Sequence, residues 1–315
     1  MCIRDRFRKC LVRTASIITC TAIVATSVTP AFAAGITSGT TAASSYVISN
    51  GTTAAKSSVI SNEVSTDTSV SWPQAPDITC ESAILVDADT GSILYEKDAH
   101  RKCYPASTTK ILTGLLTIEN CNLSDTLTFS TAAANSINPI EDANLGMKAG
   151  EELTVEQALY ALLLYSANEV AYALAEKVAG SIDAFVDMMN EKAKELGMEN
   201  THFMNTNGLD EDDHYSSARD VAIMSRELMK HETIFNYTSI WMDTLRGGKF
   251  QLANTNKLIR FYDGANGLKT GSTSKALCCL SAAAKRNDMQ LIAVVLGAPT
   301  SAERFASAKS LLDYG

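Results

Sequence analysis

The stretch PASTTKILTGLLTIE, residues 105–119, places a serine and a lysine three positions apart at the start of an apolar helical pattern. Residues three apart on a helix share a face, so the hydroxyl of Ser107 and the amine of Lys110 are expected within reach of each other. The turns that follow are apolar nearly all round, which predicts a helix buried in the core; their residues are Ile111, Leu112, Leu115 and Leu116. Taken alone, the stretch also fits an ordinary helix start with a solvated lysine.

Burial of Lys110 would make this pair reactive. A buried lysine loses the hydration of its cation, so its pKa falls and the neutral amine can accept the proton of Ser107. The N-terminus of the helix also brings partial positive charge toward an oxyanion that forms at Ser107. The stretch therefore predicts a nucleophilic serine with a lysine as its general base.

Strand patterns lie toward the two ends of the chain, and helical patterns lie between them. Residues 82–98 form two apolar runs around a turn that contains glycine, which predicts a β-hairpin. Helical spacing dominates from 107 to about 235. Strands return in 275–286 and 289–298 before a closing amphipathic helix. The simplest arrangement is an α+β fold: one antiparallel sheet formed from both chain ends, a helical region inserted between them, and a cleft at the junction.

The first 34 residues have the pattern of a secretory signal peptide. An apolar run at 14–28 is too short to span a bilayer comfortably, and Ala31-Phe32-Ala33 supplies a small-x-small cleavage site. The basic region before the run contains Arg6, Arg8, Lys9 and Arg13. We expect cleavage after Ala33 and export from the cytoplasm, to the cell wall or the outer face of the membrane. An uncleaved anchor and a lipoprotein modified at Cys20 are the alternatives.

A linker is expected between this signal and the folded domain. Residues 35–76 are rich in Ser, Thr and Ala and contain a two-copy repeat, GTTAASSYVISN at 39–50 and GTTAAKSSVISN at 51–62. With few large apolar side chains, such a segment cannot bury enough surface to offset its ordering entropy. We therefore expect a flexible linker over 35–76 and a catalytic domain over 77–315.

The composition excludes several kinds of partner. The chain has 27 Lys and Arg against 35 Asp and Glu, and residues 1–34 contain five of the bases and one of the acids. The remainder has a net charge of −12 and no basic stripe, so nucleic acid is not an expected partner. The four histidines are scattered and form no HExxH motif, so neither a metal nor another cofactor is expected. Five cysteines follow the leader without paired spacing, and no disulfide framework is expected.

Two further short motifs strengthen the catalytic interpretation. Ser166-Ala167-Asn168 is an S-x-N motif inside an apolar helical pattern, and Lys269-Thr270-Gly271 leads into a strand. Each tripeptide is weak by itself, since the first also fits a helix interrupted by small polar residues. In the order S-x-x-K, S-x-N and K-T-G, the three motifs form the signature of penicillin-binding proteins and class A β-lactamases.

On these motifs the chain resembles the D-alanyl-D-alanine carboxypeptidases, the low-molecular-mass penicillin-binding serine peptidases. The resemblance covers about residues 78–315 and extends to DADTGSILYEKDAH, NTHFMNTNGLDEDDHYSSARDVAIMS and NTNKLIRFYDGANGLKTGST. It implies the β-lactamase and DD-peptidase type of fold. It also implies removal of the terminal D-alanine from peptidoglycan stem peptides that end in D-Ala-D-Ala, and acylation by β-lactams.

The resemblance also implies a role for each site residue. Ser107 would attack the peptide carbonyl, with Lys110 as general base and Ser166 as the relay of the proton to the leaving amine. The backbone N–H groups of Ser107 and Ser272 would form the oxyanion hole. The substrate-binding residues would be Asn168, Lys269, Thr270 and Arg304. Asn168 would hold Lys110 and the substrate amide, and Lys269 would keep the cleft positive and orient Ser166. Thr270 and Arg304 would bind the terminal carboxylate. His202 and His214 are expected to be structural.

Two departures from the family pattern keep alternatives open. Leu277 stands where the family usually has glycine, and it either crowds the strand beside the cleft or packs outward. The family's smaller β-rich domain and terminal amphipathic helix are not found before Gly315, so membrane attachment is not supported. A β-lactamase on the same scaffold and a non-hydrolytic module that binds peptidoglycan or senses β-lactams are the rival functions.

Overall fold

We describe residues 73–315 in a computed structural model of the chain. The predicted signal peptide, 1–34, and the linker up to residue 72 lie outside the described residues. Residues 73–76, the end of the predicted linker, have no helix or strand, and the first strand begins at Ser82.

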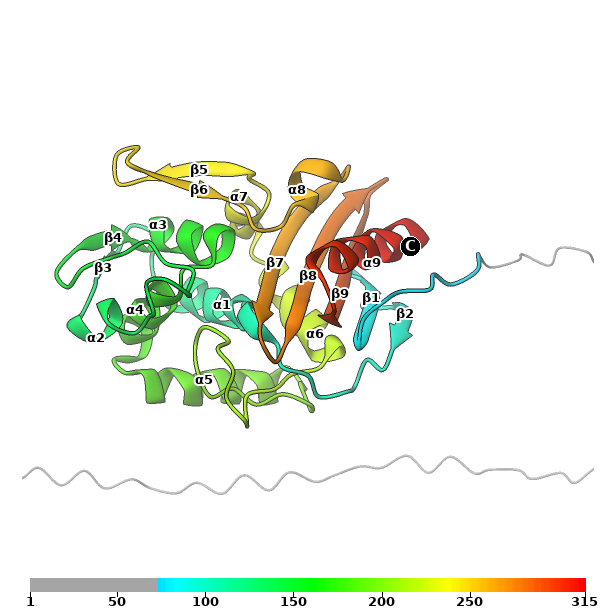
Figure 1. The fold of residues 1–315 in the computed structure, drawn as a ribbon, viewed down its shortest axis with the longest axis horizontal. Coiled ribbons are helices and arrows are strands. Elements are labelled where there is room, and N and C mark those ends of the chain that lie inside the picture. The colour runs from blue at the N-terminus through cyan, green and yellow to red at the C-terminus, as the bar shows by residue number, and fades with distance from the viewer. Residues whose placement is uncertain (1–72) are drawn as a thin grey trace, which may run out of the picture. The chain divides into compact units, whose positions relative to one another are not determined.

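A five-stranded antiparallel sheet forms the centre of the fold, in the order β2-β1-β9-β8-β7 (Figure 1). Its first two strands come from the N-terminal part and its last three from the C-terminal part, which confirms the predicted α+β class. Their bounds are β1 Ser82–Asp87, β2 Ile93–Lys97, β7 Ala265–Thr273, β8 Leu277–Arg286 and β9 Met289–Ala298. The β8–β9 turn is Asn287-Asp288, and both of its residues have positive φ, as a tight hairpin turn requires.

Both faces of the central strands are buried, because helices cover each face of the sheet (Figure 1). Helix α9, Ser301–Tyr314, packs against β8 and β9 on one face, and helix α6, Ala218–Met229, packs against β9 and β1 on the other. Successive residues of β9 point to opposite faces: Leu291 and Val295 pack with α9, while Ile292 and Val294 join the core beneath the helical region. This explains why the central strands are apolar runs without alternation of polar residues.

The helical region lies between the two sets of strands in the chain. Its longer helices are α1 Lys110–Asn120, α3 Val155–Tyr160, α4 Asn168–Ala179, α5 Ile182–Glu195 and α6. Its shorter helical pieces are η1 Ala106–Thr109, α2 Thr131–Ala134, η2 Ala161–Tyr165, η3 Glu232–Ile234, α7 Phe235–Thr238 and α8 Leu258–Phe261. Helix α1 is buried over most of its length, as its apolar pattern predicts.

Two small antiparallel ribbons in this region were not predicted from the sequence. One pairs β3, Thr126–Thr128, with β4, Glu152–Thr154, and the other pairs β5, Met242–Leu245, with β6, Phe250–Ala253. Strands of three or four residues are too short to show a period in the sequence. No helix within residues 73–315 is long and apolar enough to cross a membrane.

The helical pattern at 154–179 is interrupted by a π-helical turn. A capping box at Thr154 starts α3, which passes into η2 and ends at Ser166. Ser166 has a φ of +73°, and α4 begins two residues later at Asn168. A single-turn π-helix is frequent at functional sites because it re-aims the residues that follow it.

Candidate active site

The serine and lysine of the opening motif meet at the start of α1. Ser107 lies in the 3₁₀ turn η1, and Lys110 is the first residue of α1. Residues three apart eclipse each other in a 3₁₀ turn, and the Lys110 Nζ donates a 3.1 Å hydrogen bond to the Ser107 Oγ. Ala106 has a φ of +47°, a left-handed conformation that costs a non-glycine residue about 1–2 kcal/mol. The backbone is thus strained directly before the serine.

Lys110 is wholly buried among oxygen acceptors. Its Nζ also donates to the Asn168 Oδ1 and to the backbone carbonyl of Asn207, both at 2.7 Å. Removal from water disfavours the cation and lowers the pKa of Lys110 to about 7, while the carboxylates of Asp142 and Glu169 oppose this effect. A substantial fraction of the amine is therefore neutral near neutral pH and able to accept the serine proton.

The loop that ends at Gly208 braces the start of α1. The Thr113 hydroxyl donates to the Thr206 carbonyl at 2.6 Å, and the next carbonyl, of Asn207, accepts from the lysine. Gly208 has a φ of +89°, and a Cβ on it would lie 1.9 Å from the Ala106 carbonyl oxygen, so only glycine allows this approach. Sequence reasoning missed Asn207 as a site residue, because a backbone carbonyl has no residue-type signature.

The edge strand β7 forms the facing wall of the site. Lys269 is also wholly buried, and its Nζ donates to the Thr270 carbonyl at 2.8 Å. Burial, followed by the neighbouring cations of Lys110 and Arg304, holds the pKa of Lys269 well below its ordinary value. Two buried amines therefore lie near each other, and the cation of Lys110 makes protonation of Lys269 less favourable.

Gly271 lets β7 approach the nucleophile. A Cβ on Gly271 would lie 2.8 Å from the backbone nitrogen of Ser107 and 2.8 Å from the Ala106 Cβ. Real Cβ contacts are longer, so the strand can lie this close to η1 only with glycine. The next residue, Ser272, lines the same cleft as Ser107. The structure thus brings together the two residues predicted to form the oxyanion hole.

Ser166 reaches the cleft from the break between η2 and α4. Its side chain is 7% exposed and lines the same cleft as Ser107 and Thr270. Within the described residues, the hydrogen bonds of the Lys269 amine and the Ser107 hydroxyl go to Thr270 and Lys110, and neither goes to Ser166. Ser166 therefore lies in the predicted place without the predicted link to Lys269.

Arg304 lies near the start of α9 and is 6% exposed. Its Nη1 is 3.0 Å from the Gly271 carbonyl and 3.1 Å from the Ser272 Oγ. The same nitrogen is 3.3 Å from the Cys279 carbonyl, and Nη2 donates to the Ser301 Oγ at 3.0 Å. The guanidinium lines the cleft, but most of its N–H groups are already bonded to protein acceptors.

One cleft of about 310 Å³ joins these residues. Its rim opposite β7 includes the side chains of Glu141 and Asp142, and the backbone N–H of Asn168 holds their loop by donating to the Ala143 carbonyl at 2.8 Å. The other lining residues are Ser107, Tyr165, Ser166, Leu209, Thr255, Thr270, Gly271, Ser272, Thr273 and Arg304. The charged residues of the cleft lining are therefore Arg304, beside β7, and the two acidic residues of the 141–143 loop.

Leu277 packs outward rather than into the cleft. The residue is 38% exposed, pairs with Thr273 at the β7–β8 turn, and is absent from the cleft lining. Its φ is +57°, which a bulky side chain disfavours and glycine adopts freely. The structure thus explains a preference for glycine here by backbone conformation, and leaves the cleft open.

His214 is a buried structural histidine. Its Nδ1 accepts from the backbone N–H of Met204 at 3.0 Å, so its Nε2 carries the proton and faces the Thr109 Oγ1 at 2.9 Å. Burial lowers the pKa of His214 to about 4, so the ring is neutral at neutral pH. It braces η1 against the loop at 203–214 and does not line the cleft.

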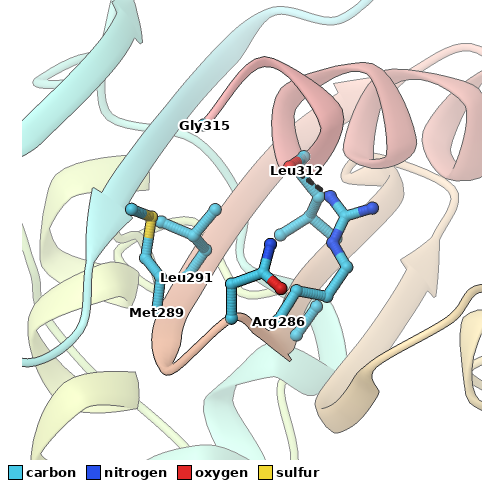
Figure 2. A pocket seen from close by; sticks show the side chains of 7 residues that line it. Arg286, Met289, Leu291, Leu312 and Gly315 are labelled. Carbon is cyan, nitrogen blue, oxygen red and sulfur yellow. Dashed lines mark hydrogen bonds between the residues drawn. The ribbon is translucent and has the colours of Figure 1, made fainter.

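A second hollow, of about 230 Å³, lies between the β8–β9 turn and the end of α9, and Figure 2 shows its lining. Arg286 donates to the Leu312 carbonyl at 2.8 Å and pairs with Asp313, while Met289 and Leu291 form the apolar side. No hydroxyl, carboxylate or amine side chain lines this hollow. It therefore lacks the groups for nucleophilic or acid–base chemistry.

Comparison with known proteins identifies the relatives of this chain. The profile of the family described as D-alanyl-D-alanine carboxypeptidase matches residues 69–300. The chain is 44% identical over 242 residues to the D-alanyl-D-alanine carboxypeptidase DacF of Bacillus subtilis, covering 74% of this chain and 61% of that protein. It is 35% identical over 256 residues to DacA of Escherichia coli, covering 77% of this chain and 62% of that protein. The chain thus spans about three fifths of the length of these relatives.

Solved structures show the same fold. The DD-transpeptidase of Streptomyces K15 superposes with a TM-score of 0.72 at 30% identity, covering 76% of this chain and 98% of that one. Penicillin binding protein 6B of Escherichia coli superposes with a TM-score of 0.73 at 33% identity, covering 78% and 79%.

Proposed function

Because the chain belongs to the D-alanyl-D-alanine carboxypeptidase family, we propose that it removes the terminal D-alanine from peptides that end in D-Ala-D-Ala, through an acyl-enzyme on Ser107. The observation that carries the proposal is the Lys110 amine, which is wholly buried and 3.1 Å from the Ser107 hydroxyl. A buried neutral amine in contact with a hydroxyl is the arrangement that a serine nucleophile with a lysine base requires.

In the proposed acylation, the Ser107 oxygen forms a bond to the carbonyl carbon between the two D-alanines. Its proton passes to Lys110, and the carbonyl oxygen becomes an oxyanion that receives the backbone N–H groups of Ser107 and Ser272. Each such donor is worth about 3 kcal/mol in comparable enzymes. The C–N bond then breaks, and the proton travels from Lys110 through Ser166 to the departing amine of D-alanine.

In the proposed deacylation, water attacks the ester of Ser107. Lys110 accepts a proton from the water, the bond between the acyl carbon and the serine oxygen breaks, and the serine regains its proton. Asn168 holds Lys110 through its side-chain oxygen at 2.7 Å. Arg304 supplies positive charge and Thr270 a hydroxyl on the wall that receives the peptide's carboxylate, and Lys269 lies buried behind that wall. These steps use side chains and backbone N–H groups of the protein, and water.

We propose peptidoglycan stem peptides as the substrate and β-lactams as acylating inhibitors of the same serine. The DacF and DacA relatives carry the carboxypeptidase name, and a penicillin binding protein is among the structures with this fold. Because stem peptides are extracytoplasmic, the signal peptide predicted for residues 1–34 fits this substrate. We propose that the protein is exported and acts on the cell wall.

The direct test compares the full chain with its Ser107→Ala variant, using Ser310→Ala on the exposed face of α9 as the matched control. Each is incubated with a peptide ending in D-Ala-D-Ala and with fluorescent penicillin. We expect D-alanine release and a stable labelled band from the wild type and the control, and neither from Ser107→Ala. Rapid release of hydrolysed penicillin would indicate a β-lactamase, and labelling without D-alanine release a β-lactam sensor.

A second candidate activity is transfer of the acyl group to an amine. The Streptomyces K15 enzyme, which this chain matches over 98% of that enzyme's length, is a DD-transpeptidase. Adding glycine or a D-amino acid as acceptor to the same assay distinguishes the two outcomes. Free tetrapeptide supports hydrolysis, and a peptide that carries the acceptor supports transpeptidation.

A further inference from the structure

The tripeptide Asn254-Thr255-Asn256, which we call the NTN strap, connects β6 to the cleft wall and has no part in the proposed steps. Both asparagines are nearly fully buried. The Asn254 amide donates to the carbonyls of Thr238 at 3.1 Å and Ile240 at 2.9 Å. The Asn256 amide donates to the carbonyl of Gly267 in β7 at 2.8 Å. The strap is therefore fixed to β7 and to the segment after α7.

The strap also joins the two walls of the cleft through Thr255. The backbone N–H of Thr255 donates to the carbonyl of Leu164, two residues before Ser166, at 3.1 Å. Its side-chain oxygen accepts a 2.6 Å hydrogen bond from the hydroxyl of Thr270 on β7. Thr255 lines the cleft and is exposed within it. The side chain is therefore held in place while its hydroxyl faces the space that a ligand would occupy.

Four hydroxyl side chains line the β7 side of the cleft, and three of them donate to protein acceptors. The Thr270 hydroxyl donates to Thr255, the Ser272 hydroxyl donates to the Gly271 carbonyl at 2.7 Å, and the Thr273 hydroxyl donates to the Asp210 carboxylate at 2.6 Å. The Thr255 hydroxyl accepts but donates to no group in residues 73–315. Among these four hydroxyl groups, Thr255 is therefore the one whose proton is free to point into the cleft.

Arg304 supplies positive charge on this side, and several of its N–H groups are engaged by the protein. Arg304 has Nη1 within hydrogen-bond distance of three protein acceptors, and Nη2 is bonded to Ser301. The Lys269 amine is wholly buried behind β7 and donates to the Thr270 carbonyl. An anion on this wall would thus feel the positive field of Arg304, and the Thr255 hydroxyl provides a direct donor beside it.

We propose that Thr255 binds the terminal carboxylate of the substrate by donating its hydroxyl hydrogen bond, with Thr270 fixing the orientation of that hydroxyl and the two asparagines acting as positioning residues. This inference rests on the proposed function, since the carboxylate is that of the D-Ala-D-Ala peptide. A hydrogen bond to a charged group is present in the Michaelis complex and in the transition state alike, so its loss raises KM more than it lowers kcat.

The test uses a pair of D-alanyl thioesters that differ only at the leaving group. One releases mercaptoacetate, which ends in a carboxylate, and the other releases the methyl ester of mercaptoacetate. Thiol release is followed for the full-length wild type, Thr255→Val and Thr255→Ser. Thr244→Val is the matched control, because it removes an exposed hydroxyl from β5, in the ribbon that leads to the strap. Thermal unfolding of each variant verifies that it folds.

We expect Thr255→Val to raise KM for the carboxylate thioester at least about tenfold with kcat within about twofold, and to leave the methyl ester nearly unchanged. Thr255→Ser should restore the KM, and Thr244→Val should match the wild type. An equal loss on both thioesters would assign Thr255 a structural role and overturn the inference, as would no loss on either.

The failure of this inference is distinguishable from failure of the proposed function. Wild-type protein that turns over neither thioester and is not acylated by penicillin overturns the proposed function and this inference together. Wild-type turnover with an unaffected Thr255→Val variant overturns only the assignment of Thr255. Benzylpenicillin also has a free carboxylate, so a slower acylation of Thr255→Val by benzylpenicillin, but not by its methyl ester, is expected as an independent readout.

Discussion

The helix-side wall of the cleft and the β7 wall each bury one lysine completely, and the two amines have different surroundings. Lys110 contacts three oxygen acceptors, and one of them is the hydroxyl of Ser107. Lys269 has a single hydrogen bond within the described residues, to the Thr270 carbonyl. Burial lowers the pKa of both lysines. Desolvation therefore does not distinguish the two lysines. Contact with the nucleophile distinguishes them, because only Lys110 is placed to exchange a proton with Ser107.

The largest expected effect compares the two lysines directly. Lys110→Met removes the proposed proton acceptor and should slow acylation by fluorescent penicillin by about 10⁴-fold. Lys269→Met removes an electrostatic contribution and should slow it by about 10²-fold. Lys257→Met makes the same substitution at an exposed lysine after β6 and should match the wild type. Equal losses at Lys110 and Lys269 would show that the two walls contribute in the same way.

The next prediction tests how closely the loop at Gly208 approaches η1. Gly208→Ala places a Cβ against a backbone oxygen at positive φ, so it should lower the free energy of unfolding by about 3 kcal/mol or more. Gly247→Ala is the control, since Gly247 has a φ of +66° and nothing within 4 Å of its Cβ position. It should cost only the conformational term, about 1 kcal/mol. Chemical denaturation measures both, and equal losses would contradict the close approach.

The pH dependence of the acylation rate tests the environment of Lys110 on the helix side of the cleft. With its pKa near 7, Lys110 is protonated below that pH and cannot accept the serine proton. The acylation rate should therefore rise with pH to a plateau above 7 and be about a hundredfold below the plateau at pH 5. Glu169→Gln removes a neighbouring negative charge that favours the lysine cation, so the acidic limb should move to lower pH. A limb that moves to higher pH would contradict this account of the Lys110 environment.

The smallest expected effect lies at the β7–β8 turn. Leu277→Gly relieves a φ of +57° without touching the cleft, and should raise the free energy of unfolding by about 0.5 to 1 kcal/mol. Leu277→Ala keeps the Cβ and should gain little, so the pair separates backbone strain from side-chain size. Acylation should not change in either variant, and a faster rate in Leu277→Gly would mean that Leu277 limits the cleft after all.

Much of the fold was predictable because local patterns and tertiary packing agree. The hairpin at 82–98, the strands at 275–286 and 289–298, and the closing helix appear within a few residues of their expected bounds. The π-helical turn at 161–165 and the two short ribbons were not predicted. A π-helical turn has no distinct sequence period, and short ribbons are stabilised by neighbours far along the chain.

In the site, too, local features were predictable from the sequence and long-range contacts were not. The three-residue spacing of Ser107 and Lys110 placed them together because it acts through local geometry. The contact of Lys110 with Asn168 was inferred from the family resemblance. The catalytic roles of these two residues stay predictions. The Asn207 carbonyl and the Thr255 hydroxyl were not foreseen, since each acts through contacts that only the folded chain creates. The predicted link between Lys269 and Ser166 is not present as a hydrogen bond within the described residues.

The sequence by itself determined the class of fold, the serine–lysine pair and the three motifs, because these depend on residue type and on spacing within a few turns of chain. Only the tertiary structure decided which backbone carbonyl holds the lysine amine, which arginine hydrogens are already engaged and which hydroxyl proton on the β7 side of the cleft is left free. Those properties depend on distances between elements up to about a hundred residues apart, such as the 97 residues between Lys110 and Asn207, and on the exclusion of water that close packing of those elements produces.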